Sequence, residues 1–133
     1  MRNFRTPHAL APLMAVSLLS PASLQSQTGV ERKVLLQEDL AVPGYQTTLI
    51  DVTLAAGARE GQHTHPGTLV GKVLEGELTL EKQGLPTETI KAGGSFSVKP
   101  GLIHEGMNRG KTPIRIVATL VAEKGKPLTA QVK

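Results

Sequence analysis

Residues 57–82 read GAREGQHTHPGTLVGKVLEGELTLEK, and this part of the chain shows most clearly which secondary structure to expect. It contains two short aliphatic runs, one around Leu69 and one around Leu78, separated by the turn Glu75-Gly76. In the second run apolar and polar residues alternate, as they do on a strand with one buried and one wet face. The stretch therefore predicts two β-strands joined by a turn.

The chain on either side of this stretch has the same character. From Val34 onward, short aliphatic segments are separated by Gly and Pro, and no long segment has the 3.6-residue period of a helix. We expect an all-β domain with strands near residues 34–37, 46–54, 69–74, 77–82, 87–91, 95–98, 103–108 and 114–122. Eight strands suit a jelly roll. The polar tail, residues 123–133, is expected to be peripheral.

The first 26 residues differ from the rest of the chain. Arg2 and Arg5 precede an apolar run over residues 9–19, which is typical of a secretory signal peptide. A membrane anchor is the alternative, but it needs about 20 apolar residues, roughly twice the length of this run. We expect a signal peptide over residues 1–26 with cleavage near residues 22–26, and a single domain over residues 27–133. The protein would then be exported, either periplasmic or extracellular, with no membrane span after processing.

Charge and composition exclude several classes of function. The chain has 15 Lys and Arg and 11 Asp and Glu; two of the basic residues and none of the acids lie in the leader, so the net charge falls from +4 to +2 on processing. No basic cluster remains, and the whole chain has only one Tyr and two Phe on which bases could stack. Nucleic-acid binding is therefore not expected. The absence of Cys excludes a disulfide framework and a thiolate zinc site.

The histidines are the candidate site. His63 and His65 are two residues apart, so on an extended strand both rings point to the same face. His104 lies further along the chain, and closure of a barrel can bring such remote segments together. Imidazole suits zinc, copper, iron and nickel, and three protein ligands leave coordination positions open. The alternative is that these are ordinary polar residues at strand ends. We favour a shared site because the only other histidine, His8, lies in the leader.

Residues 57–108 resemble the two motifs of the cupin superfamily, in particular its small single-domain type-2 members. The first motif has a glycine, five residues and H-x-H, then a strand and a further glycine; the second runs from glycine through a proline-glycine turn to histidine and asparagine. The matching positions are Gly57, His63, His65 and Gly76 for the first motif, and Gly93, Pro100, Gly101, His104 and Asn108 for the second.

This resemblance implies a fold, a metal site and a range of activities. The fold would be the cupin double-stranded β-helix, a jelly-roll barrel, and the chain would form a homodimer, which the apolar residues 114–121 also suggest. A divalent metal ion, Fe, Mn, Ni, Cu or Zn, would be held by His63, His65 and His104. The activity would be that of a small-molecule dioxygenase or isomerase. Residues expected to line the pocket are Leu69, Asn108, Gln62 and Phe96, although for Asn108 a turn-forming role is the stronger expectation.

One departure from the family pattern bears on the metal. Leu69 occupies the position where the family usually carries a glutamate ligand. Glu105 adjoins His104 and should point the opposite way on a strand, while Glu75 falls in a turn and is expected to face solvent. Three neutral ligands would leave a divalent ion with its full charge, which favours an anionic substrate or a solvent-derived anion as a further ligand. The alternative is a non-catalytic barrel that binds a small ligand without metal, with the histidines as polar or acid–base groups.

Overall fold

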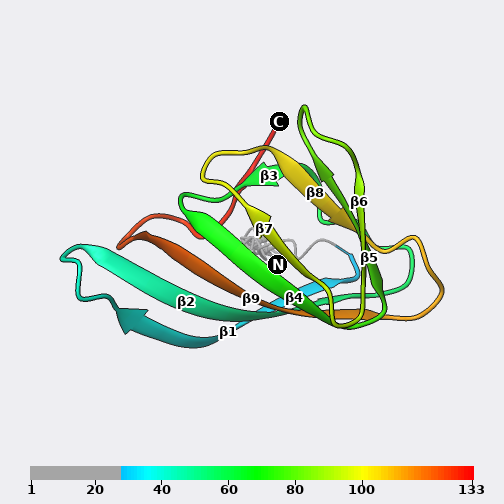
Figure 1. Cartoon of the computed structure of the whole chain (residues 1–133), viewed down its shortest axis with the longest axis horizontal. Coiled ribbons are helices and arrows are strands. Elements are labelled where there is room, and N and C mark those ends of the chain that lie inside the picture. The colour runs from blue at the N-terminus through cyan, green and yellow to red at the C-terminus, as the bar shows by residue number, and fades with distance from the viewer. Residues whose placement is uncertain (1–27) are drawn as a thin grey trace, which may run out of the picture.

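The computed structural model describes residues 28–133, which form ten strands in two sheets (Figure 1). The expected signal peptide lies outside these residues. The strands are β1 Val30–Asp39, β2 Tyr45–Leu54, β3 His63–Thr64, β4 Thr68–Glu75, β5 Glu77–Lys82, β6 Glu88–Lys91, β7 Ser95–Val98, β8 His104–Met107, β9 Ile114–Glu123 and β10 Ala130–Gln131. The described part of the chain has no helix that is long and apolar enough to cross a membrane.

The two sheets have five strands each. In the long sheet the order is β1-β2-β9-β4-β7, and in the short sheet it is β10-β3-β8-β5-β6; every pairing is antiparallel. Figure 1 shows the short sheet closing over part of the long sheet, while one end of β1 and β2 extends beyond it. Six of the eight pairings join strands that are not consecutive in the chain, and β1-β2 and β5-β6 are the exceptions. Such crossovers are typical of a jelly roll. The expected all-β jelly-roll fold is confirmed.

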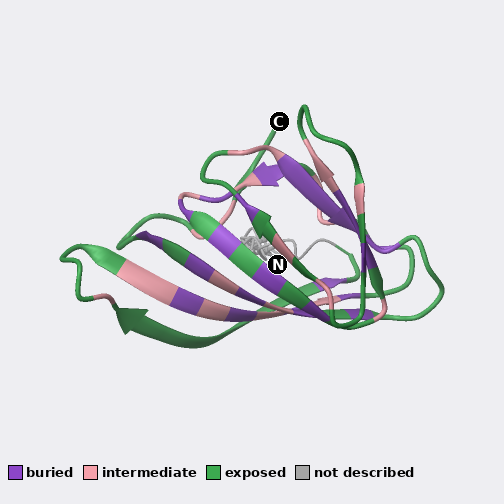
Figure 2. Ribbon diagram, viewed as in Figure 1, coloured by how far each residue is buried: buried purple, intermediate pink, exposed green. Residues whose placement is uncertain are grey.

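Alternation of side chains makes the core. In β9, the residues Ile114, Ile116, Ala118 and Leu120 are buried, whereas the residues between them are exposed or half-buried. The strand β2 alternates in the same way, and Figure 2 shows the resulting purple and green bands along β4 and β9. Because side chains on a strand point alternately to opposite faces, one face of the long sheet packs against the short sheet. The sandwich interior is therefore mainly aliphatic.

Two glycines in this region allow close packing. A Cβ at Gly67 would overlap the backbone carbonyl of Val121, and a Cβ at Gly71 would overlap the ring of Phe96. Gly71 and Phe96 are also direct partners between β4 and β7. The ring of Phe96 therefore packs over the space that a side chain at residue 71 would fill, and this brings Phe96 toward the interior.

The expected strands agree with the observed ones except at three strands. The first strand is longer than residues 34–37, since β1 covers Val30–Asp39, and β3 and β10 were not expected. The tail over residues 123–133 lies at the surface as expected, and none of its residues is buried, but it adds an edge strand to the short sheet. Ala130 pairs with Thr64, and the half-buried Leu128 packs against the interior. A polar composition did not indicate this because the tail is held mainly by backbone hydrogen bonds of β10 to β3.

Candidate metal centre

The three histidines meet where β3 and β8 lie side by side. His63 begins β3 and is the register partner of His104, which begins β8; His65 follows two residues after His63. The ring centroids are 4.2 Å apart for His63 and His104, 5.0 Å for His63 and His65, and 4.9 Å for His65 and His104. One ring nitrogen from each histidine lies within 4.8 Å of those of the other two. The expectation that His104 joins the His63 pair in space agrees with this geometry.

A backbone carbonyl fixes the orientation of each imidazole. His63 Nδ1 lies 2.7 Å from the oxygen of Gly61, His104 Nδ1 lies 2.9 Å from that of Leu102, and His65 Nδ1 lies 2.8 Å from that of Leu128. A carbonyl oxygen only accepts hydrogen bonds, so each Nδ1 must carry the proton and donate it. Each Nε2 is then unprotonated and presents its lone pair, which is the form of imidazole that binds a metal.

Burial keeps the rings neutral. The exposed fractions of His63, His65 and His104 are 1%, 7% and 4%. Desolvation lowers the pKa of all three and brings that of His63 to about 4, although the carbonyl hydrogen bonds oppose the shift. The positive charge that one ring would carry also disfavours protonation of its neighbours. The three rings are therefore neutral at neutral pH, and each can offer its Nε2 lone pair to a metal ion.

The histidines border a small cavity between the sheets. Its volume is about 50 Å³, well below the roughly 300 Å³ or more of sites that take drug-sized ligands. Eight of its lining residues are aliphatic or aromatic, and Leu69 and Phe96 are among them. The polar lining consists of the three histidines with Arg32, Glu60 and Thr129. A larger open hollow of about 620 Å³ lies elsewhere, and no histidine borders it.

No carboxylate takes the place of the missing ligand. Leu69 is 7% exposed and lines the cavity, and the histidines are the only group of three or more possible ligands within residues 28–133. Glu105 is buried, but both its oxygens accept hydrogen bonds from Arg59 at 2.9 Å, and the backbone N–H of Gly61 donates to one of them. Glu75 is exposed at the end of β4. Both residues are thus placed as expected, outside the cavity.

Two of the expected lining residues lie elsewhere. Asn108 is buried, but its amide donates to the carbonyls of Leu54 and Thr112, and its Oδ1 accepts from the backbone N–H of Gly110. It therefore holds the turn after β8, which was the stronger expectation. Gln62 borders a different hollow, on the other side of His104. On a strand its side chain points away from that of His63, and this alternation explains the difference.

The sequence did not indicate three parts of the site. Arg32 and Glu60 form an ion pair of 3.0 Å at the cavity, and Thr129 comes from the tail that was expected to be peripheral. Arg32 lies on the same face of β1 as the core residue Val30, two positions earlier. The two-residue spacing from Val30 could have indicated that Arg32 faces the interior. The remaining residues of β1 are exposed, so no alternating pattern makes this visible.

The donor set fits a divalent transition metal. Three buried imidazoles have their Nδ1 protons engaged by carbonyl oxygens, and their Nε2 lone pairs have no hydrogen-bond donor among residues 28–133. A buried acceptor without a partner is unfavourable, and a metal ion would remove that cost for all three rings at once.

Comparison with known proteins agrees with this architecture. The Cupin domain family matches residues 50–120. Germin-like protein subfamily T member 3 of Arabidopsis thaliana is 36% identical over 92 residues, which is 63% of this chain and 40% of that protein. Germin-like protein 1-1 of Oryza sativa subsp. japonica is 34% identical over 84 residues, 57% of this chain and 39% of that protein. The chain thus spans about two fifths of the length of these curated relatives.

Solved structures share the fold. A Klebsiella pneumoniae protein with a double-stranded β-helix domain superimposes with a TM-score of 0.63 at 24% identity, covering 81% of this chain and 88% of that one. Oxalate oxidase in complex with the substrate analogue glycolate superimposes with a TM-score of 0.61 at 24% identity, covering 90% of this chain and 63% of that one. With its two facing sheets, its paired histidine strands and a family match over residues 50–120, the chain belongs to the cupin family.

Proposed function

We propose that His63, His65 and His104 bind one divalent transition metal ion, and that the protein is an exported metal-dependent enzyme acting on a small molecule. The observation that carries the proposal is the set of three Nδ1–carbonyl hydrogen bonds, which leaves three Nε2 lone pairs close together in a buried site. A dioxygenase or an isomerase is the type of activity that the family suggests.

The chain's own residues would act by positioning and by excluding water. The carbonyl hydrogen bonds hold the rings in one orientation, so a metal ion binds without reorganising them. The aliphatic lining keeps bulk solvent out and strengthens electrostatic interactions inside. When bound, the ion would supply Lewis acidity and polarise an oxygen of the substrate. Since the histidines are neutral and Leu69 adds no charge, the site would favour an anionic ligand.

The likeness to oxalate oxidase concerns the fold. That enzyme was crystallised with glycolate, a two-carbon acid, and a cavity of about 50 Å³ excludes acids much larger than this. A small organic acid is therefore our first candidate for a substrate.

The second candidate function is a non-catalytic barrel that captures a small ligand without metal. Leu69 favours it, because a leucine in place of the usual carboxylate makes the cavity more apolar and weakens the metal site. In this case the three Nε2 atoms would accept hydrogen bonds from the ligand.

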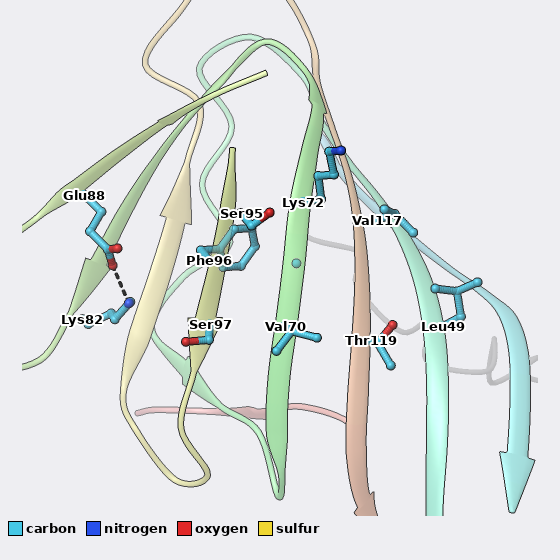
Figure 3. A pocket seen from close by; sticks show the side chains of 11 residues that line it. Leu49, Val70, Lys72, Lys82, Glu88, Ser95, Phe96, Ser97, Val117 and Thr119 are labelled. Atoms are coloured by element: carbon cyan, nitrogen blue, oxygen red, sulfur yellow. Dashed lines mark ion pairs between the residues drawn. The ribbon is translucent and has the colours of Figure 1, made fainter. Parts of the chain in front are cut away.

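We further propose that the chain forms a homodimer through the outer face of the long sheet. Figure 3 shows Leu49, Val70, Val117 and Thr119 on neighbouring strands along the open hollow. Val70 is 50% exposed, so this face presents apolar surface that a second copy would cover. Sedimentation of the purified protein would test this: a monomer would refute it.

Metal content tests the main proposal. The domain of residues 27–133 is purified, reconstituted in turn with iron, manganese, nickel, copper and zinc, and analysed for bound metal. We expect near-stoichiometric metal, its loss in the double variant His63→Ala, His104→Ala, and its retention in Gln62→Ala, which changes a neighbouring side chain outside the cavity. Circular dichroism checks that the double variant is folded, and His104→Gln serves if it is not. Absence of metal in the wild type under all five conditions would favour the ligand-binding barrel instead.

A further inference from the structure

A positively charged residue lies at the cavity beside the histidines. Arg32 belongs to β1, where it pairs with Val52 and so shares the inward face of the long sheet. Its side chain is 31% exposed, which places the guanidinium at the opening of the cavity rather than deep inside. Burial is the main cause of the low pKa values of His63 and His65, and the charge of Arg32 lowers both further.

Glu60 holds this arginine in place. Its Oε1 accepts a hydrogen bond of 3.0 Å from Arg32 Nη2, and its Oε2 accepts one of 3.1 Å from the backbone N–H of Gly106. The backbone N–H of Glu60 donates in turn to the carbonyl of Gly106 at 3.0 Å. A Cβ at residue 106 would overlap Glu60 Oε2, so the carboxylate depends on a glycine there. Glu60 is thus held against Gly106 of β8, which lies two residues after His104.

Most of the hydrogen-bonding capacity of Arg32 is unused. Among residues 28–133 its partner is Glu60 alone, through one nitrogen, although a guanidinium offers five N–H donors. Arg59 provides a contrast within the same chain, because it donates through two nitrogens to both oxygens of Glu105 and lies outside the cavity lining. The Arg59 pair is a complete bidentate contact, whereas the Arg32 contact uses one nitrogen of a residue that lines the cavity and leaves its other donors without a protein partner in the described part of the chain, residues 28–133.

We propose that Arg32 binds the carboxylate of a small organic acid in this cavity and that Glu60 positions its guanidinium. The inference rests on the proposed function, since it names the substrate class of the same site. The planar fork of a guanidinium matches a carboxylate in geometry and charge. The cavity of about 50 Å³ limits the ligand to a few heavy atoms, and a divalent ion on the histidines would add positive charge to the same cavity. Glu60 is a positioning residue in this arrangement.

The competing explanation is that Arg32 and Glu60 only connect β1 to the segment before β3. Partly exposed ion pairs of this kind contribute little to stability. The same chain supplies a matched control: Arg115 on β9 donates to Asp51 on β2, on the outer face of the same sheet and away from the cavity. If both ion pairs are only structural, replacing either arginine should have a similar, small effect on the affinity for the acid. If Arg32 binds the acid, only the replacement of Arg32 should weaken binding.

Calorimetric titration of the metal-loaded protein with glycolate and with its neutral analogue glycolamide tests the proposal. We expect glycolate to bind the wild type at least about tenfold more tightly than glycolamide, as a charge-assisted hydrogen bond implies. Arg32→Gln should weaken glycolate binding by about tenfold or more and leave glycolamide unchanged. Arg32→Lys should retain part of the glycolate affinity because it keeps the charge without the fork. Arg115→Gln should match the wild type.

Metal content, measured on each protein first, separates this inference from the proposed function. If the wild type holds no metal, the metal proposal fails, and the same titration on the metal-free protein still tests Arg32. Glycolate affinities within about threefold of one another for the wild type, Arg32→Gln and Arg115→Gln would overturn the proposal. Equal affinity of the wild type for glycolate and glycolamide, or no binding of glycolate, would also overturn it. Arg32→Lys keeps the test valid if the glutamine variant fails to fold.

Discussion

Acidification should destabilise the metal-free protein through His63. The folded state lowers the pKa of this ring from 6.5 to about 4 because the ring is buried. Well above pH 6.5 the ring is neutral in both the folded and the unfolded state, so its burial does not make stability depend on pH. As the pH falls from 6.5 toward 4, the unfolded chain binds a proton on this ring and the folded chain does not. The free energy of unfolding therefore decreases over this range. For these two values, lowering the pH from about 7.5 to about 5 removes about 2 kcal/mol from the free energy of unfolding.

The other two histidines act in the same direction, since burial also lowers their pKa values. Glu105 should add little to the measured change. Its pKa is lowered from 4.5, chiefly by its hydrogen bond to Arg59, so the stability that it contributes is lost mainly at pH values below the interval measured. Urea unfolding of chelator-treated protein across this pH interval measures the loss. Proton NMR of the imidazole rings provides a direct check. A free energy of unfolding that does not change with pH, or a His63 ring that titrates near 6.5, would show that burial does not hold this ring neutral.

Three further predictions follow from the same geometry. Leu69→Glu buries a carboxylate, so it should lower the stability of the metal-free protein by about 2 kcal/mol or more, as measured by urea unfolding. The same variant should raise metal affinity, as measured by competition with a chelator. Leu69→Gln should lower the stability in the same way but leave metal affinity unimproved. Deleting residues 126–133 removes the carbonyl that orients His65 and should weaken metal binding by about 10- to 100-fold, and unchanged affinity would contradict the proposed role of that hydrogen bond. Gly67→Ala should cost several kcal/mol, about 3 or more, because its Cβ would overlap the β9 backbone, while Gly110→Ala, which has room for a Cβ, should be nearly neutral in thermal unfolding.

Most of the fold could be predicted because it depends on alternation. The strands β2, β5 and β9 are long enough to show a two-residue period, and turn residues mark their ends. The strands β3 and β10 have two residues each, which is too short for any period to appear. Their pairing depends on what the rest of the barrel brings alongside them, and local sequence does not encode this.

Only part of the candidate site could be predicted from the sequence. The histidines could be identified because they are few and two of them are spaced for one strand face. The groups that orient them could not, since a backbone carbonyl is supplied by every residue type and leaves no mark in the sequence. Arg32 and Glu60 were missed for another reason: they are 28 positions apart, and only the packing of β1 against the segment before β3 brings them together.

The carbonyl groups that hold the three imidazoles have a consequence for how the protein could be altered. A side-chain partner could be deleted by a single codon change, but no substitution at residues 61, 102 or 128 removes the oxygen that the ring contacts. The geometry of the donor set is therefore robust to point mutation and is inherited with the path of the backbone. Adaptation to a new ligand, in nature or in the laboratory, would act through replaceable side chains around the cavity, such as Leu69, while the three donors persist.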